Sequence, residues 1–242
     1  MAKIHKGKNL LKSKRNGLLL RVILIIIFII GDIGLIFKID INIKYKLILI
    51  VPSIIGIFLI RYYWKNFKIV KSGVAGENIG LKIAKKLPRS YEVFSNIFLH
   101  YKGQGCEIDL VVIGDNGVFV IEVKNHNGSI AGRGYDSNWT QHKVGKNGGK
   151  YTKRINNPIK QLKKQIHIFS QSIKKEGINI WIDGIILFTN KGCNLEIKNS
   201  DTTIMSVNDN NIVKYITNHK GKKKYNRGDL DKIKKFLIKH QK

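Results

Sequence analysis

Two long apolar runs near the N-terminus constrain this 242-residue chain more than any other feature. Leu18–Phe37 is interrupted only by Arg21 and Asp32, and Leu47–Trp64 has an apolar core that ends in an arginine and three aromatic residues. The first run can span a hydrocarbon core of about 30 Å, and the second can do so with its aromatic residues at the interface. The two runs predict a transmembrane helical hairpin at residues 18–64, although a pair of buried core helices is the alternative.

Positive charge flanks this hairpin and predicts its orientation. Six Lys/Arg precede the first run, three lysines follow the second run by residue 71, and three more lie in the short connection between the runs. Basic flanks of membrane helices stay in the cytoplasm. We therefore expect a multi-pass protein of the cell membrane with both termini in the cytoplasm, in which residues 1–17 form a basic cytoplasmic segment.

The whole chain is strongly basic, with a formal net charge of +28. Such a charge suggests an anionic partner, either nucleic acid or a membrane rich in acidic lipids. The alternative is a codon effect, because Lys, Ile and Asn are abundant together, as an AT-rich genome would produce. Cys106 and Cys193 stand in no metal-ligand spacing, which fits reduced thiols better than a disulfide framework.

After residue 71 the pattern becomes that of a mixed α/β domain. Pro88 ends a short amphipathic helix that starts near Gly76, and Asn157 and Gly177 bound a longer amphipathic helix. The stretch at 128–157 is rich in glycine and is expected to be irregular. Strands are expected at 91–99, 107–113, 118–124 and 180–190, and "TTIMSV" (202–207) is a further candidate strand. Two short helices are expected in the tail at about 208–218 and 229–240.

The turn "GDNG" joins two of these strands and determines which side chains face each other. A two-residue loop is expected, at either 115–116 or 116–117. The first loop puts Asp109 opposite Glu122, and the second puts it opposite Lys124. In both registers the period of two places these three side chains on one face of the sheet, and the apolar residues between them on the other.

Two opposed carboxylates lie about 5 Å apart at their Cβ atoms and repel each other in an apolar site. Uptake of a proton or of a cation relieves this repulsion. Mg²⁺ prefers oxygen ligands and often uses one or two carboxylates together with phosphate oxygens. Asp109 and Glu122 are therefore candidate ligands for Mg²⁺ or Mn²⁺, and Lys124 is a candidate to orient water or to stabilise charge on a phosphate. A cross-strand ion pair without catalysis gives the same spacing.

Five motifs follow one another over about half of the chain: "GENIG" (76–80), "GCEIDLVVIGDNGVFVIEVKN" (105–125), "GSIAG" (128–132), "NWTQ" (138–141) and "NPIKQ" (157–161). In these motifs, residues 73 to about 190 resemble the nuclease-related domain, NERD, a branch of the PD-(D/E)XK nuclease superfamily.

The resemblance implies an α/β fold with a restriction-endonuclease-like central mixed sheet flanked by helices, which we place at residues 72–200. From its composition and pattern, the tail at 201–242 is expected to be a basic helical extension. The resemblance also implies a metal-dependent nuclease site with Asp109 and Glu122 as metal ligands and Lys124 as the catalytic lysine. Glu77 from the first helix and Gln161 from the later helix would complete the site. From the residues alone, Glu77 can equally be a capping residue and Gln161 a solvated helix residue.

A basic segment supports a phosphate partner independently of these motifs. Between Asp136 and Glu176 there are ten Lys/Arg and no acidic residue. Phosphate contacts along it would give sequence-independent, salt-sensitive binding, whereas a solvated basic surface is the alternative. The candidate nucleic-acid-binding residues are Lys143, Lys146, Lys150, Lys153, Arg154, Lys160, Lys163 and Lys164.

Together these features predict a membrane-anchored, Mg²⁺-dependent nuclease that hydrolyses phosphodiester bonds, with DNA as the expected substrate. Two other hypotheses stay open. One is a nucleic-acid-binding or scaffold protein whose nuclease-like core does not cleave, and the other is an envelope protein whose basic tail binds anionic lipid.

Overall fold

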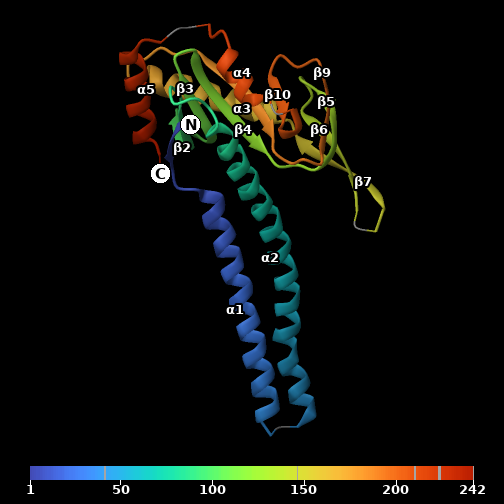
Figure 1. The fold of residues 1–242 in the computed structure, drawn as a ribbon. Helices are drawn as coiled ribbons and strands as arrows, with labels where there is room; N and C mark the ends of the chain where they lie inside the picture. Colours follow the sequence, from blue (N-terminus) through green and yellow to red (C-terminus); the bar gives the residue numbers. More distant parts are fainter. Residues whose placement is uncertain (41, 146, 210, 223–224, 242) are drawn as a thin grey trace. The chain divides into compact units, whose positions relative to one another are not determined.

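The computed structural model describes residues 1–40, 42–145, 147–209, 211–222 and 225–241 (Figure 1). The chain forms two compact units. One unit is the helical segment Asn9–Val74, and the other contains Met1–Lys8 together with Ala75–Lys242. The second unit is a mixed α/β domain whose sheets are flanked by helices, which confirms the predicted fold class.

The helical segment consists of α1 (Leu10–Lys38) and most of α2 (Ile43–Ala84). Both helices are long and apolar enough to cross a membrane, judged by length and composition. They pack closely at Gly56, where a Cβ atom would lie 2.9 Å from Ile29 Cδ1. Ser53 also donates a hydrogen bond to Asp32, so the acidic residue of the first apolar run has a partner on the second.

Helix α2 extends further than the sequence predicts. The expected short helix near Gly76 is the last part of α2, which continues without a break from the second apolar run to Ala84. The intervening residues contain no proline, so nothing removes a backbone donor from the helix there. The predicted separate helix is therefore wrong in its start but correct in its type.

The larger sheet has six strands in the order β1-β2-β3-β4-β8-β10. Strand β3 pairs antiparallel with β2 and with β4, whereas β1 pairs parallel with β2, and β8 pairs parallel with β4 and β10. Their bounds are Lys3–Lys6 (β1), Glu92–Tyr101 (β2), Gln104–Gly114 (β3), Gly117–Lys124 (β4), Ile182–Phe188 (β8) and Thr203–Ser206 (β10). The basic N-terminal segment thus contributes an edge strand to the domain.

The β3–β4 hairpin adopts the first of the two predicted registers. Gly114 pairs with Gly117, and Leu110 pairs with Ile121, so the loop is Asp115–Asn116. Continuing this register by one residue puts Asp109 opposite Glu122. The residues of β4 that alternate with Glu122, among them Phe119 and Ile121, belong to a different core cluster on the other face of the sheet.

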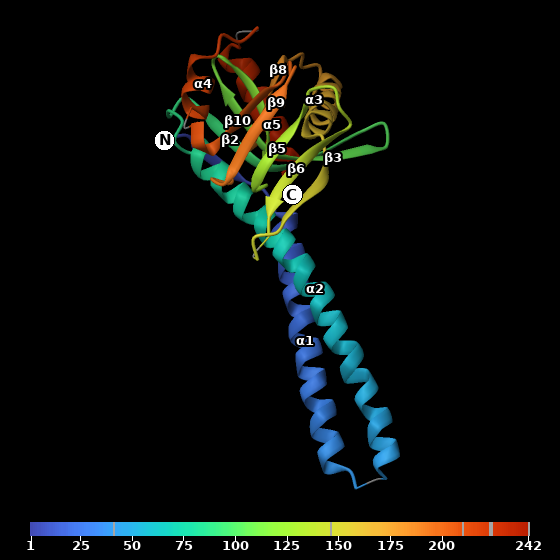
Figure 2. The same cartoon turned by 90° about the vertical axis from the view of Figure 1, so that its right-hand side faces the viewer.

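A second sheet has four strands in the order β7-β6-β5-β9, and Figure 2 shows β5, β6 and β9 side by side. Their bounds are Gly128–Arg133 (β5), Asn138–Val144 (β6), Lys150–Asn156 (β7) and Cys193–Lys198 (β9). The prediction of an irregular stretch at 128–157 is therefore wrong. Gly132 belongs to the strand because Trp139 packs against its backbone, where a Cβ atom would lie 2.3 Å from the indole ring.

Helix α3 (Pro158–Lys174) packs across β2, β3, β4 and β8 and covers one face of the larger sheet. It begins as predicted, with the Asn157 side chain accepting a hydrogen bond of 2.9 Å from the Ile159 amide and Pro158 at the first helical position. The remaining helices are η1 (Val207–Asp209), α4 (Ile212–Asn218) and α5 (Arg227–Lys239). Helix α5 belongs to the same hydrophobic cluster as α3, and α4 belongs to the cluster on the opposite face of the larger sheet.

Candidate active site

Two carboxylates meet at the end of the β3–β4 hairpin that lies away from its turn. Glu122 on β4 is 2% exposed, and Asp109 on β3 is partly buried. The Val123 amide donates a hydrogen bond of 2.7 Å to Asp109 Oδ2. Burial, followed by the charge of Glu122, raises the pKa of Asp109 well above its ordinary value. Asp109 and Glu122 therefore tend to take up a proton or a cation, as the sequence predicts.

Lys124 joins this pair to helix α3. Its Nζ atom donates to Glu122 Oε1 at 2.5 Å and to Gln161 Oε1 at 2.9 Å. Lys124 is 23% exposed, so its ammonium group reaches from the buried carboxylate toward solvent. Charge-assisted hydrogen bonds of this kind hold a side chain in one orientation. The structure thus brings Asp109, Glu122, Lys124 and Gln161 together.

Gln165 is a site residue that the motifs do not identify. It is 2% exposed, and its Nε2 atom donates to Glu122 Oε2 at 2.6 Å and to the Glu107 carbonyl at 2.8 Å. Its Oε1 atom has no hydrogen-bond partner among the described residues. The sequence feature that could have identified Gln165 is its spacing. It follows Gln161 by four residues and therefore lies on the same face of the helix.

Glu77 lies in the last part of α2, which packs on the other face of β4. Its charge contributes to the raised pKa of Asp109, after burial and the charge of Glu122. Glycines on either side allow the close approach of the helix. A Cβ atom at Gly76 would lie 2.6 Å from Asn125 Cβ, and one at Gly80 would lie 2.9 Å from a methyl group of Val123. The glycines of "GENIG" therefore have a packing role.

The carboxylate oxygen atoms of Asp109 and Glu122 can supply some of the ligands of a hard divalent cation. Each carboxylate oxygen that accepts one hydrogen bond keeps a second lone pair, and Asp109 has its Oδ1 atom in addition. Among the described residues, no group of three or more His, Cys, Asp or Glu side chains forms a metal cluster. Two carboxylates fit an ion such as Mg²⁺, which takes its other ligands from water and substrate phosphate.

The predicted basic residues that the structure describes lie on the β6–β7 hairpin and on helix α3. Lys143 lies on β6 and Lys150, Lys153 and Arg154 on β7, whereas Lys160, Lys163 and Lys164 lie on α3. Lys146 lies outside the described residues. Lys163 forms an exposed ion pair with Asp201 at 3.0 Å, and Lys160 donates to Ser137 at 2.9 Å. The β6–β7 hairpin thus carries four of these cations.

His126 follows β4 directly and lies among cations. Burial, followed by the charges of Lys124, Lys143 and Lys153 in that order, lowers its pKa to about 4. The imidazole is therefore neutral at physiological pH. Because the same ring is affected by Lys124 and by two hairpin lysines, the positive potential of the site continues onto the β6–β7 hairpin.

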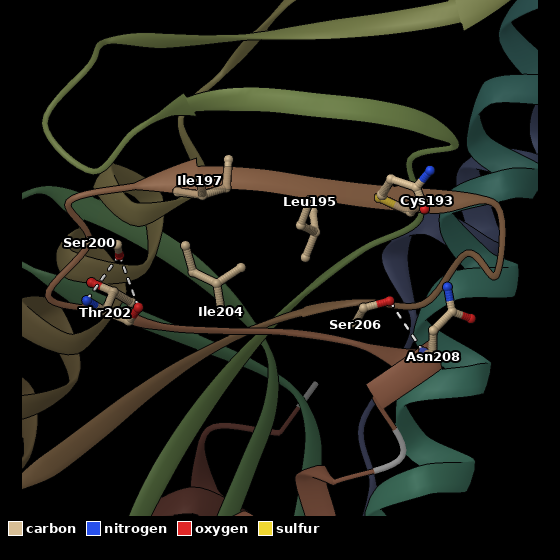
Figure 3. A pocket seen from close by; sticks show the side chains of 9 residues that line it. Cys193, Leu195, Ile197, Ser200, Thr202, Ile204, Ser206 and Asn208 are labelled. Carbon is tan, nitrogen blue, oxygen red and sulfur yellow. Dashed lines mark hydrogen bonds between the residues drawn. The ribbon is translucent and has the colours of Figure 1, made fainter.

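A cavity of about 550 Å³ lies elsewhere, between β9 and β10 (Figure 3). Leu195 and Ile204 face each other across it, and the described lining residues include no acid, histidine, lysine or arginine. Burial raises the pKa of its Cys193 thiol to about 11, so the thiol stays protonated and is a poor nucleophile. Unlike the carboxylate pair, the described lining of this cavity therefore offers no charged acid or base.

Parts of this chain are similar to known proteins. An uncharacterized protein of Bacillus anthracis is 41% identical over 71 residues, which cover 28% of this chain and 34% of that protein. The similarity thus spans about a third of the length of this relative. No significant match was found among solved structures. The family model of the nuclease-related domain matches residues 72–189, and this part of the chain is therefore a nuclease-related domain.

Proposed function

We propose that the protein is a metal-dependent nuclease that cleaves phosphodiester bonds, with DNA as its substrate. The observation that carries the proposal is the buried Glu122 carboxylate, which Lys124 and Gln165 hold at its two oxygen atoms beside Asp109. A site built for stability alone gains little from two neighbouring buried carboxylates, because their repulsion opposes folding. Their retention in one place is typical of a functional site.

Asp109 and Glu122 would hold a divalent cation, Mg²⁺ or Mn²⁺. Such an ion, when bound, polarises a phosphoryl oxygen and lowers the pKa of a bound water. The raised pKa of Asp109 favours this assignment, since a cation relieves the repulsion that raises it. Glu77, whose charge acts on Asp109, adds to the negative potential that attracts a cation to this place.

Lys124 would act on the substrate phosphate. Its ammonium group is held between Glu122 and Gln161, so it keeps one orientation while its exposed part meets solvent. From this position it can orient the attacking water and stabilise negative charge that develops on the phosphate. Gln161 and Gln165 would position Lys124 and Glu122, respectively, without contacting the substrate.

The proposal includes an anchor in the cell membrane formed by α1 and α2, with both termini in the cytoplasm. Strand β1 supports this topology. It pairs with β2, and the Gly7 amide donates to the Ser95 carbonyl at 3.0 Å. Both ends of the helical segment Asn9–Val74 therefore lead into one domain. A hairpin that crosses a membrane twice is compatible with this connection, whereas a single crossing is not.

Cysteine labelling tests this topology. Lys44→Cys lies at the start of α2, and Lys102→Cys lies in an exposed turn of the domain. Both natural thiols have a pKa of about 11 because of burial, which keeps their labelling low. An impermeant maleimide should label Lys44→Cys in intact spheroplasts and Lys102→Cys only after lysis. Labelling of Lys102→Cys without lysis would contradict the proposed orientation.

The nuclease proposal is tested with the full chain in nanodiscs, supercoiled plasmid as substrate, and Mg²⁺, Mn²⁺ or EDTA in the buffer. We expect nicking that requires the metal and that Lys124→Ala reduces by about 10²–10⁴-fold. Lys102→Ala, an exposed lysine outside the site, is the matched control and should retain wild-type activity. Binding of DNA without cleavage under all metal conditions would instead favour a nuclease-like binding protein.

A further inference from the structure

The two faces of the β6–β7 hairpin differ in what they contact. The strand register pairs Trp139 with Ile155, Gln141 with Lys153 and Lys143 with Tyr151, so these six side chains share one face. The other face carries the alternating residues, among them Lys150 and Arg154. Trp139 and Ile155 are buried in the main core, so the first face is turned toward the domain. We call it the inward face.

The character of the inward face changes along the hairpin. At its base, Trp139 and Ile155 are apolar and buried. The next position, Gln141, is 1% exposed, and its Nε2 atom donates to the Asn127 carbonyl at 2.7 Å, which ties the hairpin to the segment that leaves β4. Lys153 lies opposite Gln141, and beyond this pair the inward face consists of Lys143 and Tyr151, where the hairpin projects past the rest of its sheet (Figure 1).

The lysines of the inward face act on the active-site segment. Lys143 and Lys153 both lower the pKa of His126, as Lys124 does. The register makes Lys143 and Lys153 diagonal neighbours on this face, and Lys153 lowers the pKa of Lys143, after burial. A cluster of like charges that repel each other at the edge of a site is stabilised when an anion such as a phosphate binds between them. The inward face therefore carries two neighbouring cations between which a phosphate can bind.

Tyr151 indicates which form of nucleic acid this surface takes. Its side chain is 51% exposed on the strand of Lys153 and opposite Lys143. An exposed aromatic ring among cations is the usual platform on which proteins stack the bases of single strands. The bases of a duplex offer no free face except at its ends, because each is stacked on its neighbours. An unpaired base can use this ring, and a base inside a duplex cannot.

We propose that the inward face of the β6–β7 hairpin binds an unpaired strand, with its phosphates at Lys143 and Lys153 and one base stacked on Tyr151. This inference rests on the proposed function in one respect, namely that the strand continues into the site at Lys124. It names the substrate class of that site as single-stranded nucleic acid, or duplexes with unpaired segments. The outward face of the same hairpin takes no part in this binding.

The test measures binding by the full chain in nanodiscs, in EDTA so that nothing is cleaved, to a single-stranded DNA oligonucleotide and to the duplex of the same sequence. Lys143→Gln/Lys153→Gln removes two charges from the inward face. Lys150→Gln/Arg154→Gln removes two charges from the outward face of the same hairpin and is the matched control. All four residues are exposed or half-buried, so both variants should keep the wild-type unfolding temperature.

We expect the inward pair to weaken single-strand binding at least ~10-fold and the outward pair to weaken it less than ~3-fold. Tyr151→Ala should weaken single-strand binding by roughly 5- to 100-fold and leave duplex binding unchanged, and Tyr151→Phe should bind as the wild type does. Equal losses from the inward and outward pairs would overturn the proposal, as would equal binding of both DNAs with no effect of Tyr151→Ala. The binding assay contains no metal, so its result does not depend on cleavage. A protein that binds the single strand here but does not cleave in the Mg²⁺ assay would refute the nuclease function and leave this inference intact.

Discussion

Gln165 on α3 donates a hydrogen bond of 2.6 Å to Glu122 on β4, and each of the two side chains is 2% exposed. Lys124 donates to the other Glu122 oxygen at 2.5 Å. A carboxylate so deeply buried is tolerated when its oxygen atoms are hydrogen-bonded. Helix α3 therefore fixes the position of the acid as well as covering the sheet.

Replacement of Gln165 by alanine should destabilise the protein. The substitution removes a donor from the buried Glu122 carboxylate, so we expect the free energy of unfolding to fall by about 1–3 kcal/mol. Denaturant unfolding of the full chain, followed by circular dichroism, measures this change. Gln161→Ala is the matched control, because Gln161 lies on the same helix but is exposed. An equal fall in the free energy of unfolding for both variants would show that the buried hydrogen bond contributes no more to stability than the exposed one.

Replacement of Asp109 by asparagine should stabilise the protein in EDTA at neutral pH. The pKa of Asp109 is higher in the folded state than in the unfolded state, so its protonated form stabilises the fold. This contribution to the free energy of unfolding is complete at a pH below the unfolded-state pKa, and it is lost as the pH rises through the folded-state pKa. The wild type thus loses stability over this window above about pH 4, and Asp109→Asn should lose less. Thermal unfolding at several pH values measures the difference, with the exposed Asp115→Asn as control. A variant that is less stable than the wild type at neutral pH would contradict the assignment.

The ring of His126 should report on the inward lysines. Its pKa of about 4 results from burial and from the charges of Lys124, Lys143 and Lys153. We expect Lys143→Gln/Lys153→Gln to raise this pKa part of the way toward 6.5, because burial remains. Titration of ¹⁵N-labelled histidine by NMR, on the full chain, gives the value directly. An equal rise in Lys150→Gln/Arg154→Gln would mean that the hairpin presents its other face to His126.

The second sheet depends on a close contact at Gly132. A Cβ atom there would lie 2.3 Å from the Trp139 indole ring, and Trp139 is itself buried. Gly132→Ala should therefore lower the free energy of unfolding by about 1–3 kcal/mol through overpacking. Gly149 is the control, since no atom lies within 4 Å of a Cβ built there. Denaturant unfolding in which Gly149→Ala costs as much as Gly132→Ala would refute this role.

The same glycine explains why the second sheet cannot be predicted from the sequence. Glycine, when only its neighbours in the chain are considered, indicates a loop. Its place in β5 depends on Trp139 of the adjacent strand, and this packing is a property of the folded sheet. Strand β1 is missed for a related reason, because four residues with charged ends form a strand here through pairing with Glu92–Ser95, far away in the chain.

The carboxylate site is more accessible to prediction because a period of two fixes the face of each strand residue. The sequence narrows the register to two loops but does not choose between them. The structure chooses the loop at Asp115–Asn116, where the Asn116 side chain donates to the Ile216 carbonyl at 2.6 Å and accepts from the Tyr91 hydroxyl at 3.0 Å. These partners are distant in the chain, so local turn preferences contain no information about them.

The most direct test of the nuclease assignment is the cleavage rate of a labelled single-stranded DNA under single-turnover conditions, as a function of Mg²⁺ concentration. Wild type, Asp109→Asn and Asp115→Asn are compared; the last two make the same chemical change at the site and in the nearby turn. We predict Mg²⁺-dependent cleavage by wild type and by Asp115→Asn, and a loss of at least ~100-fold in Asp109→Asn. Cleavage by Asp109→Asn at the wild-type rate, or cleavage that persists in EDTA, would contradict the account.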